Sequence, residues 1–478
     1  MKILYAGSEA VPFAATGGLG DVMGSLPAAV KRSLGEGSDI RAVIPLYPSI
    51  REKFGDALSP VWEGEISLSW RRQYMGIFSI ERDGVTFYFI DNEYYFRRES
   101  FYGDFDDGER FAFFSAAVLE LIGIVGFFPD VIHANDWQTA LVPVYLRLWY
   151  GGRSEYDSIR TVYTIHNIAY QGIYSPEILW DVFGIWDRDR HILDYGGAVN
   201  LSKGAIVCAD RVTTVSPSYA GEILTEHYSH GLCHILRDNS HKLSGIINGI
   251  DTVKYDPEKD PHIIKNYTAR SLTGKAECRD ELCSMCGFEN ERTPVIAMVS
   301  RLASHKGFDL VERVIREMLD SGDAKFVLLG TGEGRYEDYF RYLDHIYGGR
   351  FKAFITFDSA LASKIYAGAD MFLMPSESEP CGLAQMIASR YGCVPIVRET
   401  GGLRDTIHPL RDDTGEGNGF TFTNYNAHDM MYTVRRAVSV HKNKRKWNTL
   451  VRRVMSVDFS WDRSAVEYKE LYESLMQK

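Results

Sequence analysis

The sequence predicts an α/β protein made of two similar halves, each a parallel sheet with helices on both faces. Short apolar runs alternate with helical patterns along most of the chain, as expected for strands buried on both sides. The tetrapeptide Thr-Gly-Gly-Leu occurs at residues 16–19 and 400–403, each time between an apolar run and a helical pattern. Glycines at a helix start let a ligand approach the backbone, where free N–H groups attract anions. The repeat favours a cleft shared by two halves over two ordinary strand–helix turns.

The first half contains a series of predicted strands with a different region inserted after the second. In the insertion, residues 75–81 and 85–91 flank Asp83 and Gly84, a dipeptide typical of a two-residue hairpin turn. An aromatic-rich stretch, residues 94–102, follows this hairpin. The other strands are expected at residues 2–7, 39–45, 131–134, 161–165 and 211–215.

The second half alternates more regularly, and the chain ends in a helical pattern at residues 461–477. The segment 248–251 marks the boundary, so we expect one domain over residues 1–247, a second over 248–456 and a final helical segment over 457–478. Ligands of open α/β sheets bind at the carboxyl ends of the strands, so the segments that follow strands supply the candidate site residues. Strands are expected at residues 295–299, 326–329, 351–357, 371–374 and 394–397, and helices at 308–319 and 361–369.

Composition and charge exclude several classes of protein. With 478 residues, 45% of them hydrophobic and 24% charged, the chain is globular and long enough for two or three domains. A net charge of −11 argues against nucleic acid or an anionic membrane as the main partner. No segment has the pattern of a signal peptide or the length of a membrane span, so we expect a soluble, cytoplasmic protein.

Two further features have simpler explanations than ligand binding. Cys278, Cys283 and Cys286 have the spacing of some iron–sulfur ligands, but their helical pattern and the lack of a nearby fourth ligand favour chance thiols. No other segment has convincing metal-ligand spacing, so neither a metal nor another cofactor is predicted. The basic run at residues 441–446 is expected to be a solvated helix face rather than an anion site.

The densest group of candidate ligands is at residues 376–385, after the predicted strand 371–374. Glu379 can accept hydrogen bonds from sugar hydroxyls, while the N–H groups of Gly382 and Leu383, at the start of the next helix, can hold phosphate oxygens. This pattern suits a sugar phosphate. The alternative is a helix N-terminus whose acidic residues complement the helix dipole.

Two cations follow the predicted strand at residues 295–299. Arg301 and Lys306 can grip a diphosphate from two sides, Lys306 as a compact charge and Arg301 as a bidentate fork. Fixed cations lower a barrier most where leaving-group charge develops. The alternative is a surface loop with solvated charges.

Histidines and an aspartate follow two other predicted strands. His133 and Asp136 come at the end of one apolar run, and His166 comes at the end of the next. These residue types suit acid–base chemistry or a metal. His133 is equally consistent with a buried histidine whose ring nitrogens are hydrogen-bonded within the core.

Taken together, these motifs resemble the bacterial glycogen synthase and plant starch synthase family of retaining glucosyltransferases. The resemblance implies the GT-B fold, in which two Rossmann-like domains face a deep cleft and a final helix crosses back to the first domain. It also implies transfer of glucose from a nucleotide-diphosphoglucose, usually ADP-glucose in bacteria, to the non-reducing end of an α-1,4-glucan, without a metal or cofactor. The similar segments, in family order, are residues 8–13, 16–22, 133–137, 164–167, 248–251, 300–307, 378–385 and 400–405.

The resemblance assigns roles to individual residues. Glu379 lies by the glucose, and Arg301 and Lys306 neutralise the departing diphosphate. His166 contacts the glucose 6-hydroxyl and Asp136 lines the acceptor side. The acceptor hydroxyl attacks on the face that the nucleotide leaves, so the configuration is retained without the nucleophilic carboxylate of retaining hydrolases. The remaining predicted substrate contacts are Gly17, Gly18, Asn248, Cys381, Gly382, Leu383, Thr400 and Gly401, together with Phe357 against the base and Tyr95 on the acceptor.

The aromatic stretch at residues 94–102 is predicted to help bind the glucan, because sugar rings offer C–H faces that stack on aromatic rings. Tyr95 and Tyr102 are the rings chosen to test this, and the alternative is that they pack the hairpin against the first domain. One residue departs from the family pattern: Ala15 stands where the family has a lysine that reaches the donor phosphates. The alternatives are therefore an enzyme that prefers UDP-glucose, a GT-B enzyme of another specificity, or a glucan-binding homologue without turnover.

Overall fold

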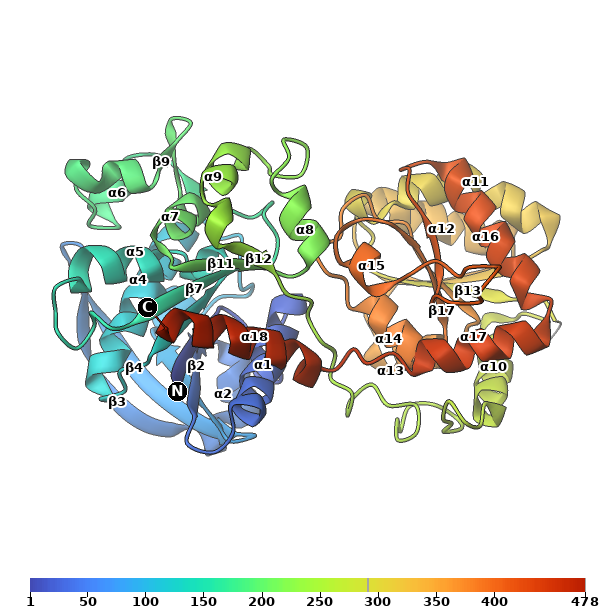
Figure 1. Cartoon of the computed structure of the whole chain (residues 1–478), viewed down its shortest axis with the longest axis horizontal. Helices are drawn as coiled ribbons and strands as arrows, with labels where there is room; N and C mark the ends of the chain where they lie inside the picture. Colours follow the sequence, from blue (N-terminus) through green and yellow to red (C-terminus); the bar gives the residue numbers. More distant parts are fainter. Residues whose placement is uncertain (290–291, 478) are drawn as a thin grey trace. The chain divides into compact units, whose positions relative to one another are not determined.

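The computed structural model describes residues 1–289 and 292–477, and the chain divides into two compact units (Figure 1). Unit 1 consists of Met1–Gly249 together with the segment from Trp461 onward. Unit 2 consists of Ile250–Ser460. The chain therefore leaves unit 1 once and returns to it with its last helix.

Unit 1 is built on a nine-stranded sheet in the order β12-β11-β7-β6-β1-β2-β5-β4-β3. The strands from β12 to β5 are parallel, while β4 and β3 extend the sheet as antiparallel strands. A small separate sheet has the order β8-β10-β9. The bounds are β1 (Lys2–Ala6), β2 (Asp39–Pro45), β3 (Ser59–Leu68), β4 (Arg71–Arg82), β5 (Val85–Asp91), β6 (Val131–Asn135), β7 (Arg160–Ile165), β8 (Ile173–Tyr174), β9 (Asp194–Tyr195), β10 (Ala198–Asn200), β11 (Arg211–Thr214) and β12 (Leu243–Gly245).

The predicted hairpin is confirmed as the connection between β4 and β5. Asp83 and Gly84 have φ angles of 51° and 74°, the two positive values that a type I′ turn requires. Helices cover the sheet, and α4 (Asp107–Ile124) is buried on nearly every side, consistent with the long apolar run at its centre. The other helices of unit 1 are α1 (Gly18–Leu34), α2 (Pro48–Phe54), α3 (Glu93–Phe96), α5 (Leu141–Tyr145), α6 (Ile178–Asp181), α7 (Leu201–Cys208), α8 (Pro217–Glu222), α9 (Cys233–Asp238) and α18 (Trp461–Met476).

The last helix, α18, packs against α1 in unit 1 (Figure 1). Its inward residues recur at helical spacing, and Tyr468 and Tyr472 are fully buried. The hydroxyl of Tyr472 lies 2.8 Å from the hydroxyl of Tyr5 and 2.7 Å from Nδ1 of His133. The other ring nitrogen of His133 lies against the hydroxyl of Thr164. His133 is thus a hydrogen-bonded core residue that helps to fix α18.

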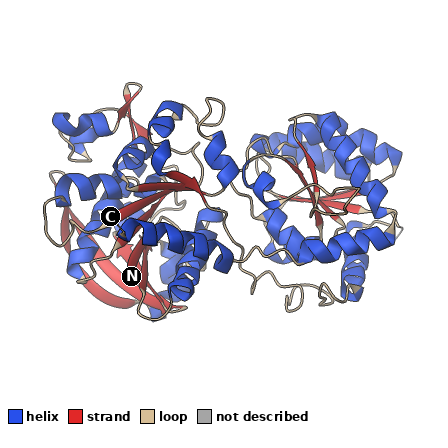
Figure 2. Ribbon diagram, in the orientation of Figure 1, coloured by secondary structure: helices blue, strands red, loops and turns tan. Residues whose placement is uncertain are grey.

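Unit 2 is built on a six-stranded, all-parallel sheet in the order β15-β14-β13-β16-β17-β18. Figure 2 shows these strands lying between helices. The bounds are β13 (Val295–Val299), β14 (Lys325–Leu329), β15 (Phe351–Phe354), β16 (Met371–Met374), β17 (Val394–Arg398), β18 (Phe420–Phe422), α10 (Thr273–Cys286), α11 (Phe308–Ser321), α12 (Gly334–Ile346), α13 (Ser359–Gly368), α14 (Ala384–Arg390), α15 (Gly401–Thr406), α16 (Ala427–His441) and α17 (Lys444–Met455).

The fold class predicted from the sequence is therefore confirmed: each unit is a doubly wound α/β sheet. The apolar runs predict the strands because a strand such as β16, with all four residues buried, must be apolar on both faces. Among the described residues, none of the helices combines the length and the apolar character that crossing a membrane would require.

Candidate active site

Three loops of unit 2 meet at the carboxyl ends of adjacent strands. In the sheet order, β13, β16 and β17 are neighbours and run parallel, so the loops that follow them emerge at one edge. The loop after β13 carries Arg301 and Lys306, and the loop after β16 carries Glu379. The second Thr-Gly-Gly-Leu segment follows β17. Residues that are far apart in the sequence are thereby brought to one edge of the sheet, as expected for the ligand edge of such a sheet.

The centre of this edge is an ion pair between Lys306 and Glu379. The ammonium nitrogen Nζ of Lys306 lies 2.6 Å from Oε2 of Glu379, with only 18% and 8% of the two side chains exposed. The hydroxyl of Ser376 donates to the same Oε2 at 3.1 Å. Within the described residues, the other carboxylate oxygen of Glu379 receives no hydrogen bond, so it is available to a ligand hydroxyl.

The glycines of the second motif serve the packing of this loop. Gly401 has a φ of 43°, and a Cβ atom there would lie 2.0 Å from the carbonyl oxygen of Glu379. The N–H of Gly402 donates to that carbonyl at 3.1 Å, and a Cβ at Gly402 would lie 2.2 Å from the carbonyl oxygen of Cys381. The preceding residue, Thr400, is buried. In this structure, the backbone of Glu379 and Cys381 therefore occupies the space beside these two glycines.

The other residues of the 376–385 segment are held by hydrogen bonds that the sequence did not predict. Gln385 Nε2 donates to the carbonyl oxygens of Cys381 and Gly382, at 3.1 and 2.9 Å. Cys381 is buried, and Leu383 is half-buried just before α14. Arg398, at the end of β17, donates to the carbonyl of Glu377 at 2.6 Å. Gln385 and Arg398 therefore position the loop that carries Glu379. In the sequence, the one signal for these two residues is that they lie within or close to the predicted motifs.

Two predicted ligands of unit 2 extend into solvent. Arg301 is exposed, and its guanidinium forms no hydrogen bond or ion pair with the described part of the chain. Phe357 follows β15 and is 92% exposed. An unpaired guanidinium and an exposed ring are free to contact a diphosphate and a base, respectively.

In unit 1, Asp136 and His166 follow the neighbouring strands β6 and β7 and contact each other. Oδ1 of Asp136 accepts a hydrogen bond from the backbone N–H of His166 at 2.7 Å. Nε2 of His166 lies 3.0 Å from Oδ1 of Asn135, whose amide nitrogen donates to the carbonyls of Ala6 and His133. Because Asn135 presents its oxygen, Nε2 of His166 must carry the hydrogen. This leaves Nδ1 of His166 as an acceptor.

Burial shifts the pKa values of both residues toward their neutral forms. Burial lowers the pKa of the His166 imidazole to about 3, so His166 is uncharged near neutral pH. Burial also raises the pKa of Asp136 to about 7, although hydrogen bonds from the backbone N–H groups of His166 and Asn167 oppose that rise. Asp136 also has a φ of 59°, a value that non-glycine residues rarely adopt. A strained backbone and a carboxyl that titrates near neutral pH are both typical of functional sites.

The first Thr-Gly-Gly-Leu segment begins α1 and is open to solvent. Gly17 and Gly18 are exposed, and a Cβ atom at Gly17 would meet nothing within 4 Å. Glu9, which the sequence did not single out, is buried and accepts hydrogen bonds from the N–H and hydroxyl of Thr16 and from the Tyr102 hydroxyl. Glu9 thus fixes the backbone just before the glycines.

Ala15 is exposed next to this open helix start. Two other cations, Lys203 and Arg404, are candidates to replace the missing family lysine. However, Lys203 donates its ammonium hydrogens to the carbonyl oxygens of His191 and Asp194. Lys203 is therefore engaged with the backbone of its own unit.

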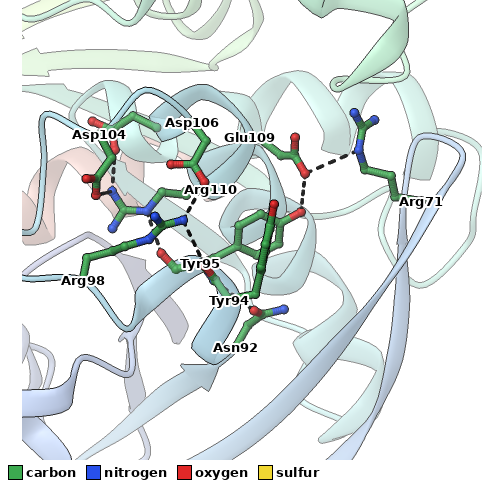
Figure 3. Close-up of polar contacts among 10 residues, drawn as sticks. Arg71, Asn92, Tyr94, Tyr95, Arg98, Asp104, Asp106, Glu109 and Arg110 are labelled. Atoms are coloured by element: carbon green, nitrogen blue, oxygen red, sulfur yellow. Dashed lines mark hydrogen bonds and ion pairs between the residues drawn. The ribbon is translucent and has the colours of Figure 1, made fainter.

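The structure corrects the expectation that the ring of Tyr95 stacks on a sugar. Tyr95 is fully buried, and its ring centroid lies 4.9 Å from that of Phe113. Its hydroxyl donates to Glu109 at 2.6 Å, and Glu109 also lies 3.4 Å from Arg71 (Figure 3). The packing alternative therefore describes Tyr95, whereas its neighbour Tyr94 is 65% exposed. A run of aromatic residues in the sequence does not show which rings face the core and which face solvent.

Asn248 and the three cysteines of α10 are the remaining residues that the sequence singled out. Asn248 is buried, and its side-chain oxygen receives no hydrogen bond from the described residues. Cys278, Cys283 and Cys286 are free thiols on α10, and burial raises the pKa of each. Over residues 1–289 and 292–477, no group of three or more His, Cys, Asp or Glu side chains is arranged to hold a metal ion.

Two Rossmann-like units with polar loops at the carboxyl ends of their strands are the architecture of the GT-B class of glycosyltransferases, and the comparisons with known proteins assign the chain to that class. Residues 2–238 match the family model "Starch synthase catalytic domain", and residues 287–453 match "Glycosyl transferases group 1". The chain is 48% identical to a glycogen synthase of Bacillus cereus and 48% identical to one of Clostridium novyi, in both cases over the full length of both chains. The chain belongs to the glycogen and starch synthase family and is a glycosyltransferase of that type.

A solved structure supports the same assignment. The catalytic domain of starch synthase IV from Arabidopsis thaliana, bound to ADP and acarbose, is 36% identical to this chain. The match has a TM-score of 0.90 and covers 100% of this chain and 99% of the plant domain. The GT-B fold predicted from the sequence is thereby confirmed.

Proposed function

We propose that this chain is a glycogen synthase that transfers glucose, with retention of configuration, from ADP-glucose to the non-reducing 4-hydroxyl of an α-1,4-glucan. The observation that carries the proposal is the Lys306–Glu379 ion pair, which holds a cation and a carboxylate 2.6 Å apart at the ligand edge of unit 2. Transfer from a sugar nucleotide needs both groups, a carboxylate for the sugar hydroxyls and a cation for the leaving diphosphate.

We assign the donor to unit 2. Arg301 and Lys306 contact the diphosphate, Glu379 and the loop at Cys381 and Gly382 contact the glucose, and Phe357 contacts the base. The exposed, unpaired guanidinium of Arg301 and the 92% exposed ring of Phe357 support this assignment. Support for adenine as the base comes from the plant relative, whose solved structure contains ADP.

We assign the acceptor side and the glucose 6-hydroxyl to unit 1. His166 is neutral and presents Nδ1 as an acceptor, which suits a hydrogen bond from a sugar hydroxyl. Asp136 can accept or donate a hydrogen bond near neutral pH because its pKa is about 7. Gly17 and Gly18 offer backbone N–H groups to the donor phosphates.

The proposed reaction is a displacement on one face of the glucose ring. The bond between C1 and the diphosphate oxygen breaks as the acceptor 4-hydroxyl bonds to C1, and the hydroxyl proton passes to the departing diphosphate. Arg301 and Lys306 stabilise the negative charge that develops on that diphosphate. No carboxylate forms a covalent bond to the sugar, which distinguishes the reaction from retaining glycoside hydrolysis.

The test is turnover of ADP-glucose and UDP-glucose side by side, with glycogen and maltodextrins as acceptors. We expect a higher kcat/KM with ADP-glucose and new linkages that an α-1,4-specific amylase removes completely. Preference for UDP-glucose would refute the choice of donor, and amylase-resistant linkages would refute the stereochemistry. Absence of turnover with both donors would indicate a glucan-binding homologue without activity.

We further propose that the enzyme acts in the cytoplasm. All seven cysteines are free thiols, as is usual in reducing compartments. Sedimentation of the activity with a membrane fraction, or its recovery outside the cell, would contradict this location.

A further inference from the structure

Three exposed tryptophans lie on the turn between β3 and β4 of unit 1 or on the segment 180–186, which packs against that turn: a Cβ atom at Gly184 would lie 3.4 Å from Cα of Ser69. Trp70 is 70% exposed, Trp180 58% and Trp186 69%. Tryptophan is on average a highly buried residue, so three exposed indoles in one region require an explanation. We call this group, Trp70, Trp180 and Trp186, the tryptophan surface.

The β3–β4 turn and the segment that carries Trp180 are fixed to each other. The indole N–H of Trp70 donates to Oδ1 of Asp181 at 2.8 Å, and the hydroxyl of Ser69 donates to the carbonyl of Trp180 at 2.9 Å. Arg71 lies 2.9 Å from Oδ2 of Asp181 and also donates to its carbonyl. Both carboxylate oxygens of Asp181 are thus used to hold the turn.

The orientation of Trp70 is further fixed from the core. The guanidinium carbon of Arg71 lies 4.4 Å from the centroid of the Trp70 ring. Arg71 also pairs with Glu109, which accepts the hydroxyl of the buried Tyr95 (Figure 3). A continuous series of polar contacts therefore runs from Tyr95 to an exposed indole. A ring ordered in this way loses little conformational entropy when a ligand stacks on it.

The turn lies at the same edge of the sheet as Asp136 and His166. In the pairing of β4 with β5, Gly76 stands opposite Asp91, the last residue of β5, so Arg71–Met75 extend past the carboxyl end of that strand. The order β6-β1-β2-β5-β4 separates Asp136 from β4 by four strand spacings, on the order of 19 Å. A polymer bound near Asp136 can reach the turn, whereas a short oligosaccharide cannot.

We propose that the tryptophan surface binds an α-1,4-glucan chain and holds polymeric acceptors at a distance from the reacting end. This inference rests on the proposed function for the choice of glucan. The apolar faces of glucose rings stack on indoles, while charged side chains around them bind the hydroxyls. A second copy of the chain is a poorer occupant, because aspartate is depleted at protein interfaces, and here Asp181 accepts the indole N–H of Trp70.

The experiment compares Trp70→Ala with the wild-type chain. Without donor, we expect the dissociation constants for glycogen and maltoheptaose, from affinity electrophoresis and calorimetry, to rise about five- to tenfold. In turnover assays, the KM for glycogen rises, while kcat and the KM values for maltotriose and donor stay unchanged. Trp70→Phe, which keeps an aromatic face, retains most of the affinity. Tyr432→Ala, which removes a 72% exposed ring from α16 in unit 2, is the matched control and changes nothing.

Two outcomes would overturn the inference. One is unchanged glycogen affinity in both Trp70→Ala and Trp180→Ala, with both variants folded by circular dichroism. The other is dissociation of an oligomer in Trp70→Ala by analytical ultracentrifugation, which would make the surface a contact between copies. Because binding is measured without donor, failure of the proposed function would appear separately, as absent turnover in the wild-type chain.

Discussion

At the scale of single residues, the two cations of the candidate site differ in a way that the sequence does not reveal. Lys306 is held by Glu379 at 2.6 Å in a poorly exposed ion pair, whereas Arg301 is exposed and unpaired in the described part of the chain. Removing one partner of a buried ion pair leaves the other charge uncompensated. The two cations should therefore respond differently to substitution, although both are assigned to the same diphosphate.

We expect Arg301→Ala to lower kcat roughly a hundredfold or more while leaving the melting temperature unchanged. A cation that stabilises leaving-group charge contributes about 3 kcal/mol, and that contribution grows toward the transition state. Lys306→Ala should lower kcat at least as much and also lower the melting temperature, because Glu379 loses its partner. Steady-state kinetics and calorimetry check both, with Lys446→Ala, an exposed cation on α17, as the control. A higher donor KM with unchanged kcat would contradict the assigned role.

The exposed position of Ala15 predicts a gain of donor affinity. We expect Ala15→Lys to lower the donor KM about five- to thirtyfold, which corresponds to roughly 1–2 kcal/mol for a charged hydrogen bond to phosphate. Lys203 does not already fill this role, because its ammonium group binds backbone carbonyls. Ala15→Gln adds nearly the same length without the charge and should have little effect. An unchanged or higher KM with both ADP-glucose and UDP-glucose would refute an empty phosphate-binding position.

The sequence predicts the residues at strand ends better than it predicts burial. Arg301, Lys306, Glu379, Asp136 and His166 all follow buried parallel strands, so their positions could be deduced from apolar runs alone. The burial of Tyr95 could not, because it depends on Glu109 and Phe113, which belong to a different helix, α4. Supporting contacts of this kind are set by tertiary packing, which leaves no periodic signal in one sequence.

At the scale of elements, the two Thr-Gly-Gly-Leu copies are not equivalent. The first begins α1, which has 17 residues, and its Gly17 faces open space. The second begins α15, which has six residues, and its Gly401 and Gly402 lie against the backbone of the loop at Glu379 and Cys381. The first copy is thus open to a ligand, and the second supports the loop that carries the catalytic candidate.

This difference predicts opposite results for the same substitution. Gly17→Ala should leave the melting temperature within about a degree of wild type but raise the donor KM, because a methyl group blocks close approach of the phosphates. Gly401→Ala should destabilise unit 2 by at least about 1–3 kcal/mol, since its φ is 43° and its Cβ would lie 2.0 Å from a carbonyl oxygen. Calorimetry and donor kinetics on both variants check this. Equal melting temperatures for the two variants would show that the copies are equivalent after all.

Elements with a strong local signal could be predicted, and those defined by their neighbours could not. The β4–β5 hairpin follows from Asp83-Gly84, and β13 and β16 from short apolar runs. β3 was not predicted, because only Ile66 and Leu68 of its ten residues are buried. Such an edge strand owes its structure to pairing with β4 rather than to its own pattern.

At the scale of the whole molecule, the chain crosses between the two units at two points, after Gly249 and after Ser460. The second crossing returns α18 to unit 1, where it completes the core with Trp461, Tyr468 and Tyr472. The core of unit 1 therefore depends on α18, which follows all of unit 2 in the sequence. The resemblance to known synthases implied this return, but the hydrogen bonds from Tyr472 to His133 and Tyr5 could not be deduced from the pattern of α18.

Truncation after Ser460 should unfold unit 1 while leaving unit 2 folded. Each large apolar side chain of α18 contributes about 1.5–3 kcal/mol on burial, so their sum approaches the roughly 5–15 kcal/mol that stabilises a typical domain. Calorimetry of the truncated chain should show the unit 2 transition alone.

Tyr472→Phe should lower the temperature of the unit 1 transition by several degrees, because His133 and the Tyr5 hydroxyl lose a buried partner at a cost of about 1–3 kcal/mol. Glu473→Ala, next to Tyr472 but exposed at the surface of α18, is the control. Two unchanged transitions in the truncated chain would show that unit 1 is complete without its last helix.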